Sequence, residues 1–261
     1  MPLRFSQVLA LKNDNYVRQK NKASAIFCTF ATYLPRPNIA FTYPSCHAIS
    51  VGYAQSGLKN GGTFVVPQFI NVGETTILDL QSLKAVGDDA SDNVQIQTLD
   101  AGGYTVDAYD WNDWAVDEPC WVDADYTPVT EVSVAPGQGF WVMGSKTAQG
   151  LQSAGKVGTS DVVVSLRNGG SATGNPFPVA LDLQDIVAEG DSASDNVQIQ
   201  LLDAGGYTLE SYDWNDWALD TPCWVDGDYN AITGVEIAPG QGLWVMGSSS
   251  AQSIRFPAPE L

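Results

Sequence analysis

The sequence predicts an all-β protein made of two tandem homologous modules, each a β-sandwich or a small barrel with one short helical turn. Three observations favour this class: a long segment is written twice, short runs alternate between apolar and polar residues, and turn-forming residues separate those runs. With 44% hydrophobic and 10% aromatic residues, the 261-residue chain is too apolar for a disordered protein. It is also long enough for two cores.

The repeat covers most of the chain. Residues 91–145 recur as 194–248 at an offset of 103, and 41 of the 55 aligned positions are identical. Upstream, Leu58–Gly62 corresponds to Leu166–Gly170 at an offset of 108, so the first copy carries five extra residues. All eight tryptophans lie in the repeats, four in each. The predicted modules are a first copy, 51–157, and a second copy, 158–261.

Short alternating runs predict the strands of each module. Val94 and Ile96 alternate with glutamines, which is typical of a half-buried strand. A turn at Ala101–Gly103 separates this run from a second alternating run, Tyr104–Tyr109, so the two predict a β-hairpin. Val162–Arg167 alternates in the same way and predicts another strand. We expect about six or seven short strands in each module.

A turn and a buried strand are predicted side by side. Ala135–Gly139 fits a type II turn, because Pro136 fixes φ and Gly137 supplies a positive φ. The run that follows, Phe140–Met143, is apolar throughout and predicts a strand buried on both faces.

The helical candidate of each copy is a single short segment, Asp79–Ala85 in the first. Asp79 can cap its N-terminus, and Leu80 and Leu83 would share one face. Gly87 would end it.

Residues 1–50 differ from the rest in charge and pattern. They carry a net charge of +5, whereas 51–261 carry −23, and they show little periodicity. Three interpretations are open: a targeting segment, residues encoded upstream of the native start, or an extension lying over the first module. Cys28 and Cys46 could pair in an oxidising compartment if the segment is retained. We expect residues 51–261 to fold without it.

Several motifs follow one another in a fixed order: Val51–Tyr53, Asn175–Pro178, Leu181–Leu183, Asp195–Gln198, Gly205–Tyr207 and Pro239–Val245. This order resembles duplicated β modules of predicted exported proteins from Gram-negative bacteria, most of which have no assigned function. The resemblance covers 51–261, and the first copy departs from it at Val66–Phe69. It implies export or association with the cell surface, and it implies no catalytic residue.

Composition argues against several classes of function. A formal net charge of −18 disfavours nucleic acid as a partner, because phosphate binding needs clustered Lys and Arg. No apolar run approaches the roughly 20 residues of a membrane-spanning helix. The chain has one histidine, His47, and neither a nucleophile elbow nor a phosphate-binding loop. Each candidate carboxylate occurs twice in a similar setting, which disfavours a glycosidase pair.

Two segments rich in tryptophan and aspartate contain the strongest candidates for ligand-binding residues. Indole faces stack on sugar rings while carboxylates and amides bind hydroxyl groups, so this composition fits a carbohydrate platform. The alternative is that the tryptophans seal the core and the aspartates form its solvated edge. The candidates are Asp110, Trp111, Asn112, Asp113, Trp114 and Trp121, with Asp213, Trp214, Asn215, Asp216, Trp217 and Trp224.

Calcium is the one cofactor that the acidic residues could hold. It takes about six to eight oxygen ligands, and no EF-hand loop is present. A solvated acidic face is the simpler explanation. The Asp-X-Asp pairs are Asp123 with Asp125 and Asp226 with Asp228, and the further clusters are Asp88, Asp89 and Asp92, and Asp191 and Asp195.

Cys120 and Cys223 occupy equivalent positions, one in each module. No disulfide can therefore form within a module. A bridge between modules would need the two Cα atoms about 5.5–6 Å apart. Two buried free thiols are the favoured alternative.

The sequence thus predicts a non-enzymatic structural or binding protein, exported and located at or near a bacterial surface. The alternative is a carbohydrate-binding protein that uses the Trp/Asp segments, and a glycoside-active enzyme ranks third. Glycans or other surface proteins are the expected partners. Buried tryptophans would favour the first interpretation, whereas two or more exposed tryptophans per module in one groove would favour the second.

Overall fold

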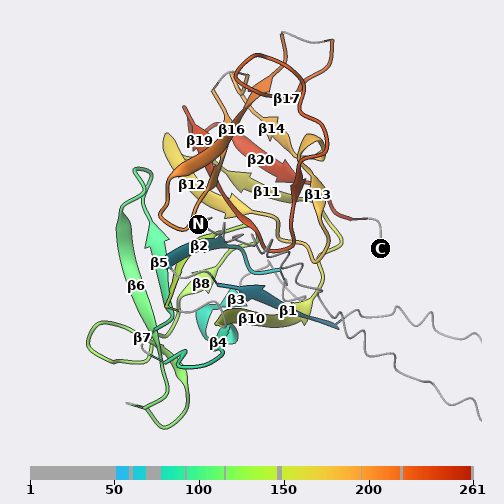
Figure 1. Ribbon diagram of the computed structural model, residues 1–261. Helices are drawn as coiled ribbons and strands as arrows, with labels where there is room; N and C mark the ends of the chain where they lie inside the picture. Colours follow the sequence, from blue (N-terminus) through green and yellow to red (C-terminus); the bar gives the residue numbers. More distant parts are fainter. Residues whose placement is uncertain are drawn as a thin grey trace, which may run out of the picture. The chain divides into compact units, whose positions relative to one another are not determined.

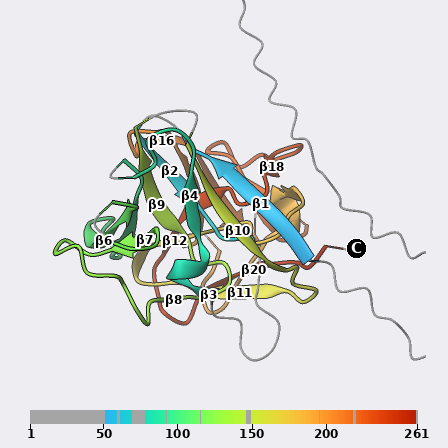
Figure 2. The same ribbon diagram turned by 90° about the horizontal axis from the view of Figure 1, so that it is seen from below.

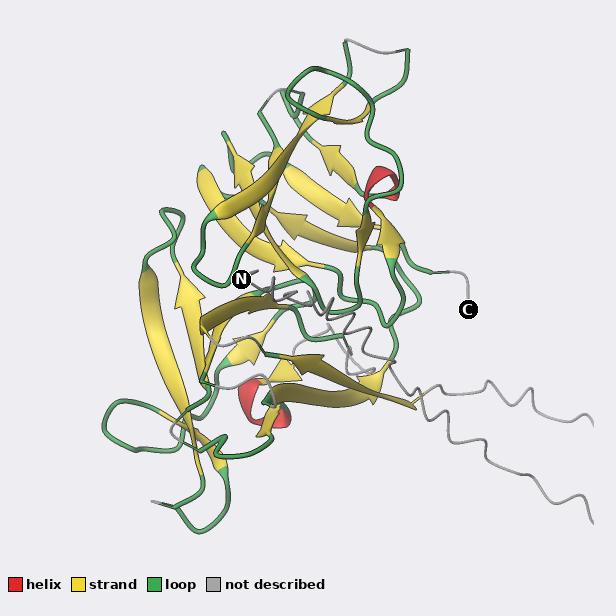
Figure 3. Ribbon diagram, in the orientation of Figure 1, coloured by secondary structure: helices red, strands yellow, loops and turns green. Residues whose placement is uncertain are grey.

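The computed structural model describes residues 51–58, 61–68, 78–91, 93–114, 116–145, 149–194, 196–217 and 220–259. All of them belong to one compact unit, His47–Leu261. This part of the chain is all-β, with several antiparallel sheets and two single 3-10 turns (Figures 1 and 3). Among these residues no helix has the length and apolar character needed to cross a membrane. The expectations for 1–50, including a Cys28–Cys46 pair, lie outside the described residues.

The strands of the first copy form three sheets. Their orders are β2-β9-β5-β6-β7, β1-β10-β4 and β3-β8, and Figure 2 shows β1, β10 and β4 side by side. The strands are β1 (Val51–Gly57), β2 (Gly61–Val65), β3 (Leu78–Asp79), β4 (Lys84–Val86), β5 (Gln95–Leu99), β6 (Thr105–Asn112), β7 (Cys120–Val122), β8 (Ser133–Val134), β9 (Phe140–Gly144) and β10 (Gly150–Lys156).

The strands of the second copy form three sheets with corresponding orders: β12-β19-β15-β16-β17, β11-β20-β14 and β13-β18. Each strand thus has the same neighbours as its counterpart in the first copy. The strands are β11 (Val162–Ser165), β12 (Gly169–Gly174), β13 (Leu181–Asp182), β14 (Val187–Glu189), β15 (Gln198–Leu202), β16 (Thr208–Asn215), β17 (Cys223–Val225), β18 (Glu236–Ile237), β19 (Gly242–Gly247) and β20 (Ser253–Phe256).

Each set of sheets has its own hydrophobic cluster. In the first copy, Ile96 and Val142 of the five-stranded sheet belong to the same cluster as Ala85 and Leu151 of the three-stranded sheet. The second copy has an equivalent cluster: Ile199 and Val245 with Ala188 and Ile254. Side chains from both sheets therefore exclude water from one core in each copy.

Local signals for turns and strands are confirmed. The hairpin joins β5 to β6, and its register shifts between Thr98 and Leu99, next to the turn. At the type II turn the Gln138 N–H donates to the Ala135 carbonyl at 3.0 Å, and Gly137 has φ +73°. The first four residues of the Val162–Arg167 run form β11, Val162–Ser165.

The helix predicted over Asp79–Ala85 is wrong in length. Only a 3-10 turn, Leu80–Ser82, forms, although Asp79 caps it as expected by accepting the Gln81 N–H at 3.0 Å. Leu83 is already extended, because the next residues pair with β10 as β4. Pairing of the strand therefore overrides the weak helical pattern.

The strand predicted over Phe140–Met143 forms, but it is not buried on both faces. In β9, Phe140 and Val142 are buried in the core, whereas Trp141 and Met143 are half-buried on the other face. This second face is only partly covered, because Trp141 lines a cavity that is described below.

The two copies exchange equivalent hydrogen bonds. The Gly62 N–H donates to the Ala204 carbonyl at 2.9 Å, and the Gly170 N–H donates to the Ala101 carbonyl at 2.7 Å. Under the offsets of the repeat these two bonds correspond to each other. Two isolated antiparallel bridges, Val65–Gln241 and Gln138–Thr173, correspond in the same way. The edge strands β2 and β12 are thus each contacted by the other copy.

Candidate functional site

Two of the candidate tryptophans in each copy are structural. Trp111 and Trp121 face each other across β6 and β7, with ring centroids 5.2 Å apart at 66°. Both are buried, and the indole Nε1 of Trp121 donates to the Leu83 carbonyl at 2.8 Å. The second copy repeats the arrangement with Trp214 and Trp224. Because these indoles fill the cores, the predicted platform cannot include them.

A glutamine of the 3-10 turn holds this tryptophan pair in place. The Gln81 amide donates to the carbonyls of Trp121, at 2.9 Å, and Val129, at 2.7 Å. Its Oε1 accepts the Trp121 N–H at 3.0 Å. Gln184 makes the corresponding three bonds in the second copy. The short turn thus positions β7 and the loop that follows it.

The remaining tryptophan of each segment, Trp114 or Trp217, is exposed and packs against a tyrosine. Trp114 is 62% exposed and Tyr126 is 51% exposed, with ring centroids 5.4 Å apart. Trp217, 61% exposed, and Tyr229, 50% exposed, form the same contact at 5.4 Å. We call these the aromatic pairs. Each Trp/Asp segment therefore exposes one indole, rather than the two that the platform hypothesis required.

Buried polar groups fix the loop that carries Trp114. Asn112 is fully buried, and its Oδ1 accepts the Trp114 N–H at 3.1 Å. The neighbouring Asp113 N–H donates to the Ser91 hydroxyl at 3.0 Å. Asn215 makes the corresponding bond to Trp217 in the second copy. The predicted site residue Asn112 thus supports the exposed indole from below and does not meet solvent.

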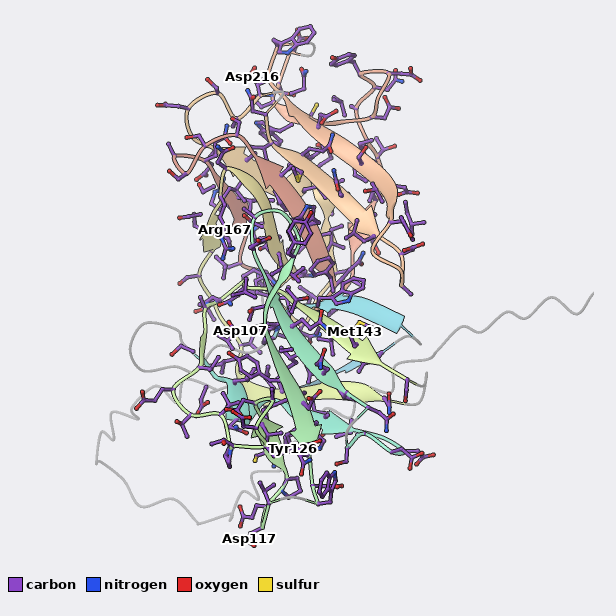
Figure 4. The ribbon with its side chains drawn as sticks, turned by 90° about the vertical axis from the view of Figure 1, so that its left-hand side faces the viewer. Asp107, Asp117, Tyr126, Met143, Arg167 and Asp216 are labelled. Atoms are coloured by element: carbon purple, nitrogen blue, oxygen red, sulfur yellow. The ribbon has the colours of Figure 1, made fainter. Side chains whose placement is uncertain are left out.

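A strained turn presents the tyrosine. One carboxylate oxygen of Asp123 accepts the N–H groups of Asp125 and Thr127, each at 2.9 Å. Within this turn Tyr126 has φ +58°, and Tyr229 has φ +61° in the second copy. For a non-glycine residue such a conformation costs about 1–3 kcal/mol and is enriched at functional sites. Figure 4 shows Tyr126 and Asp117 at the same end of the first copy.

The candidate calcium ligands have local roles in these turns. Asp123 accepts the N–H groups of Asp125 and Thr127. In the second copy Asp226 accepts the N–H groups of Asp228 and Asn230 at 2.9 Å each. The bond from the Asn230 N–H is the main cause that lowers the pKa of Asp226. No group of three or more His, Cys, Asp or Glu side chains suited to a metal occurs among the described residues, which leave out Asp92 and Asp195.

The remaining candidate carboxylates divide into two kinds. Asp110 accepts the Gln95 side-chain amide at 2.9 Å, and Asp213 accepts the Gln198 amide at 2.8 Å, so both belong to side-chain networks on the five-stranded sheets. Asp113 and Asp216 are exposed beside the aromatic pairs.

The two cysteines of the repeats are free thiols. Both are half-buried rather than fully buried, which corrects the expected burial. Burial raises the pKa of the Cys120 thiol, which lowers the fraction of reactive thiolate at neutral pH.

A cavity of about 390 Å³ lies between the two copies, and the candidate residues above do not include its lining. Trp141, Trp244 and Phe64 form its aromatic part, and Gln97, Gln200 and hairpin residues complete it. The signal for it was the alternation within 140–143, which places Trp141 and Met143 on one face. The contact between copies that creates the cavity has no local signature.

Tyr212 should titrate unusually late. Burial, followed by its hydrogen bond to Glu210, raises the pKa of Tyr212 to about 12. The fold therefore favours the neutral phenol, so its contribution to stability is complete below the unfolded pKa of about 10 and is lost as the pH rises through about 12. A tyrosinate absorbance titration of the folded protein should show a late phase that Tyr212→Phe removes. Persistence of that phase in Tyr212→Phe would contradict the assignment.

Comparison with known proteins adds no relative to this picture. No protein-family model matches the chain, and neither a curated protein nor a solved structure matches it. We therefore argue its function from its own residues.

Proposed function

We propose that the chain is a non-enzymatic binding protein, exported and held at or near a bacterial surface. In this proposal two homologous β-sandwich modules, 51–157 and 158–261, each present one aromatic pair to a neutral polysaccharide. The two separate cores, each shared by a five-stranded and a three-stranded sheet, support the modular description. Export is supported by the resemblance of 51–261 to modules of exported proteins.

The observation that carries the proposal is the repetition of one exposed feature. A tryptophan and a tyrosine, both at least half exposed, meet at 5.4 Å in each copy, and the tyrosine has a strained backbone in each. Exposed aromatic side chains that adjoin one another form a contiguous apolar surface, which is typical of interaction sites. Tyr and Trp are also the residues that dominate binding energy at interfaces.

Charge selects the kind of polymer. The net charge of −18, and the exposed Asp113 and Asp216 beside the pairs, disfavour polyanions such as nucleic acids or acidic glycans. A neutral polysaccharide offers sugar faces to the rings and hydroxyl groups to the carboxylates. Figure 4 shows Asp216 and Tyr126 at opposite ends of the described structure, so a long polymer is needed to bind both aromatic pairs, and such linkage of two weak sites raises apparent affinity by about 10²–10⁴-fold.

Removing the exposed indoles tests the proposal. Trp114→Ala or Trp217→Ala alone should weaken co-sedimentation with insoluble neutral polysaccharides such as chitin and cellulose, and the double variant should lose about 100-fold or more in apparent affinity. Because both indoles are exposed, the melting temperature should not change.

The matched control is Tyr104→Ala with Tyr207→Ala. These tyrosines are more exposed, at 76% and 75%, and have no ring partner among the described residues. They should leave binding to the polymer intact. The proposal fails if the wild-type chain binds no neutral polysaccharide, or if the control variants lose as much binding as the tryptophan variants.

A further inference from the structure

The cavity between the copies is lined almost symmetrically. Thirteen described residues line it, and twelve of them form six pairs related by the offset of 103: Gln97 with Gln200, Leu99 with Leu202, Gly102 with Gly205, Gly103 with Gly206, Thr105 with Thr208 and Trp141 with Trp244. The thirteenth is Phe64, whose equivalent is Ala172. Apart from Phe64, the two halves of the cavity are thus built by the same side chains.

Strand register explains why these side chains share one surface. Phe64 lies opposite Trp141 across β2 and β9, and Trp141 lies opposite Gln97 across β9 and β5. Their neighbours Ile96 and Val142 are in the core. Since side chains alternate between the faces of a sheet, Phe64, Trp141 and Gln97 lie on the face opposite that core.

The two indoles are covered to different extents: Trp141 is half-buried, whereas Trp244 is only 9% exposed and its ring stacks on Phe64 at 5.9 Å and 29°. Trp141 donates its Nε1 hydrogen to the Sδ of Met143 at 2.9 Å (Met143 is labelled in Figure 4), and Trp244 bonds Met246 at 3.1 Å. The N–H groups are therefore already used within the chain. Gly62 leaves the space that the Trp141 indole occupies, since a Cβ there would lie 1.7 Å from the ring.

Polar side chains at the wall of the cavity form a short hydrogen-bonded relay, and they keep further donors and acceptors that could bond a ligand. Thr105 donates its hydroxyl hydrogen to the Oε1 of Gln97 at 2.9 Å, and the Gln97 amide donates to Gln95. The second copy repeats the relay with Thr208 and Gln200, at 3.2 Å. A threonine oxygen that donates can still accept, and an amide nitrogen has a second hydrogen. The wall can thus both donate to and accept from hydroxyl groups.

Among the residues that the structure describes, no ionisable side chain lines the cavity, although the chain carries 30 Asp and Glu residues. A charged ligand would lose hydration there without gaining a counter-ion. Ring faces, amides and hydroxyls without charge are the groups that suit a neutral sugar. A volume of about 390 Å³ is near the lower end of the roughly 300–1,000 Å³ of small-molecule sites.

We infer that this cavity binds one short neutral saccharide, about a disaccharide in size, with one sugar ring against the half-buried Trp141 and its hydroxyl groups bonded to the threonines and glutamines of the wall. The site is distinct from the aromatic pairs. It has one place per chain because both copies build it together, whereas the aromatic pairs would supply two. This difference in stoichiometry separates the two proposals experimentally.

Calorimetric titration of the full chain with cellobiose, maltose, lactose and N,N′-diacetylchitobiose tests the inference. At least one should bind with one molecule per chain, and a disaccharide of galacturonic acid should bind about tenfold more weakly or not at all. Thr105→Val with Thr208→Val keeps side-chain shape but removes both hydroxyls, and should weaken binding about tenfold or more. Thr105→Ser with Thr208→Ser should retain it.

The Trp114→Ala/Trp217→Ala double variant should bind the disaccharide as tightly as the wild type, even if its binding to polysaccharide is lost. The inference is overturned if none of the four disaccharides binds at millimolar concentration, if two molecules bind per chain, or if the valine variant binds as tightly as the wild type. Equal binding of the acidic disaccharide would overturn the assignment of a neutral ligand.

Discussion

Replacing Trp121 with alanine is expected to lower the free energy of unfolding by about 3–5 kcal/mol, as for other large-to-small changes in a core. Trp121 is completely buried and packs edge-on against Trp111. The change also leaves the Leu83 carbonyl without the donor that it has at 2.8 Å. Trp224→Ala should have a similar effect, because Trp224 is equally buried and donates to the Ile186 carbonyl at 2.7 Å.

Urea denaturation followed by circular dichroism measures these losses. Trp114→Ala is the matched control, since it removes the same side chain from an exposed position and should change stability by less than about 0.5 kcal/mol. If the buried and exposed tryptophans gave equal losses, the assignment of Trp121 to the core would be wrong.

Gly242→Ala is expected to disturb the junction between the copies. An added Cβ would lie 2.3 Å from the Cβ of Phe64 and 2.6 Å from its backbone carbonyl carbon. Backbone atoms cannot turn aside as the end of a side chain can, so β19 and β2 must separate. We expect a loss of about 1–3 kcal/mol, the usual cost of overpacking, together with weaker binding of disaccharide in the adjoining cavity.

Gly227→Ala is the control for this change, because an added Cβ there meets nothing within 4 Å. Neither glycine has a φ in the left-handed region, so the comparison isolates the steric effect. Thermal melting of both variants provides the measurement. A melting temperature for Gly242→Ala equal to that of Gly227→Ala would show that the copies do not pack as closely as described.

The strands were predictable wherever a pattern is local. Alternation around Val94 and Ile96 predicts β5, and Pro136 with Gly137 predicts the turn before β9. The helix over Asp79–Ala85 was predicted too long, because its last residues pair with β10, some 65 positions later in the chain. Register of that kind depends on residues far apart in sequence, which local propensity does not contain.

The candidate site was predicted only in part for the same reason. The motif Asp110–Trp114 runs from the end of a strand into a loop, so Trp111 is buried whereas Trp114 is exposed. Alternation along β6 assigns Trp111 to the same face as Thr105, Asp107 and Tyr109, which the sequence pattern indicates as the polar face, yet Trp111 lies in the core. The cavity needs Trp141 to approach the hairpin at Gly206, 65 residues away, which spacing along the chain cannot indicate.

The hydrogen bonds that β2 and β12 each make to the opposite copy determine how the protein behaves when it is diluted. An uncovered strand edge is a template on which other chains can pair and aggregate. If the two copies were separate polypeptides, the same bonds would hold a symmetric dimer that dissociates as the concentration falls. Because one chain carries both copies, the edges stay covered however dilute the protein becomes, including after release into a large volume.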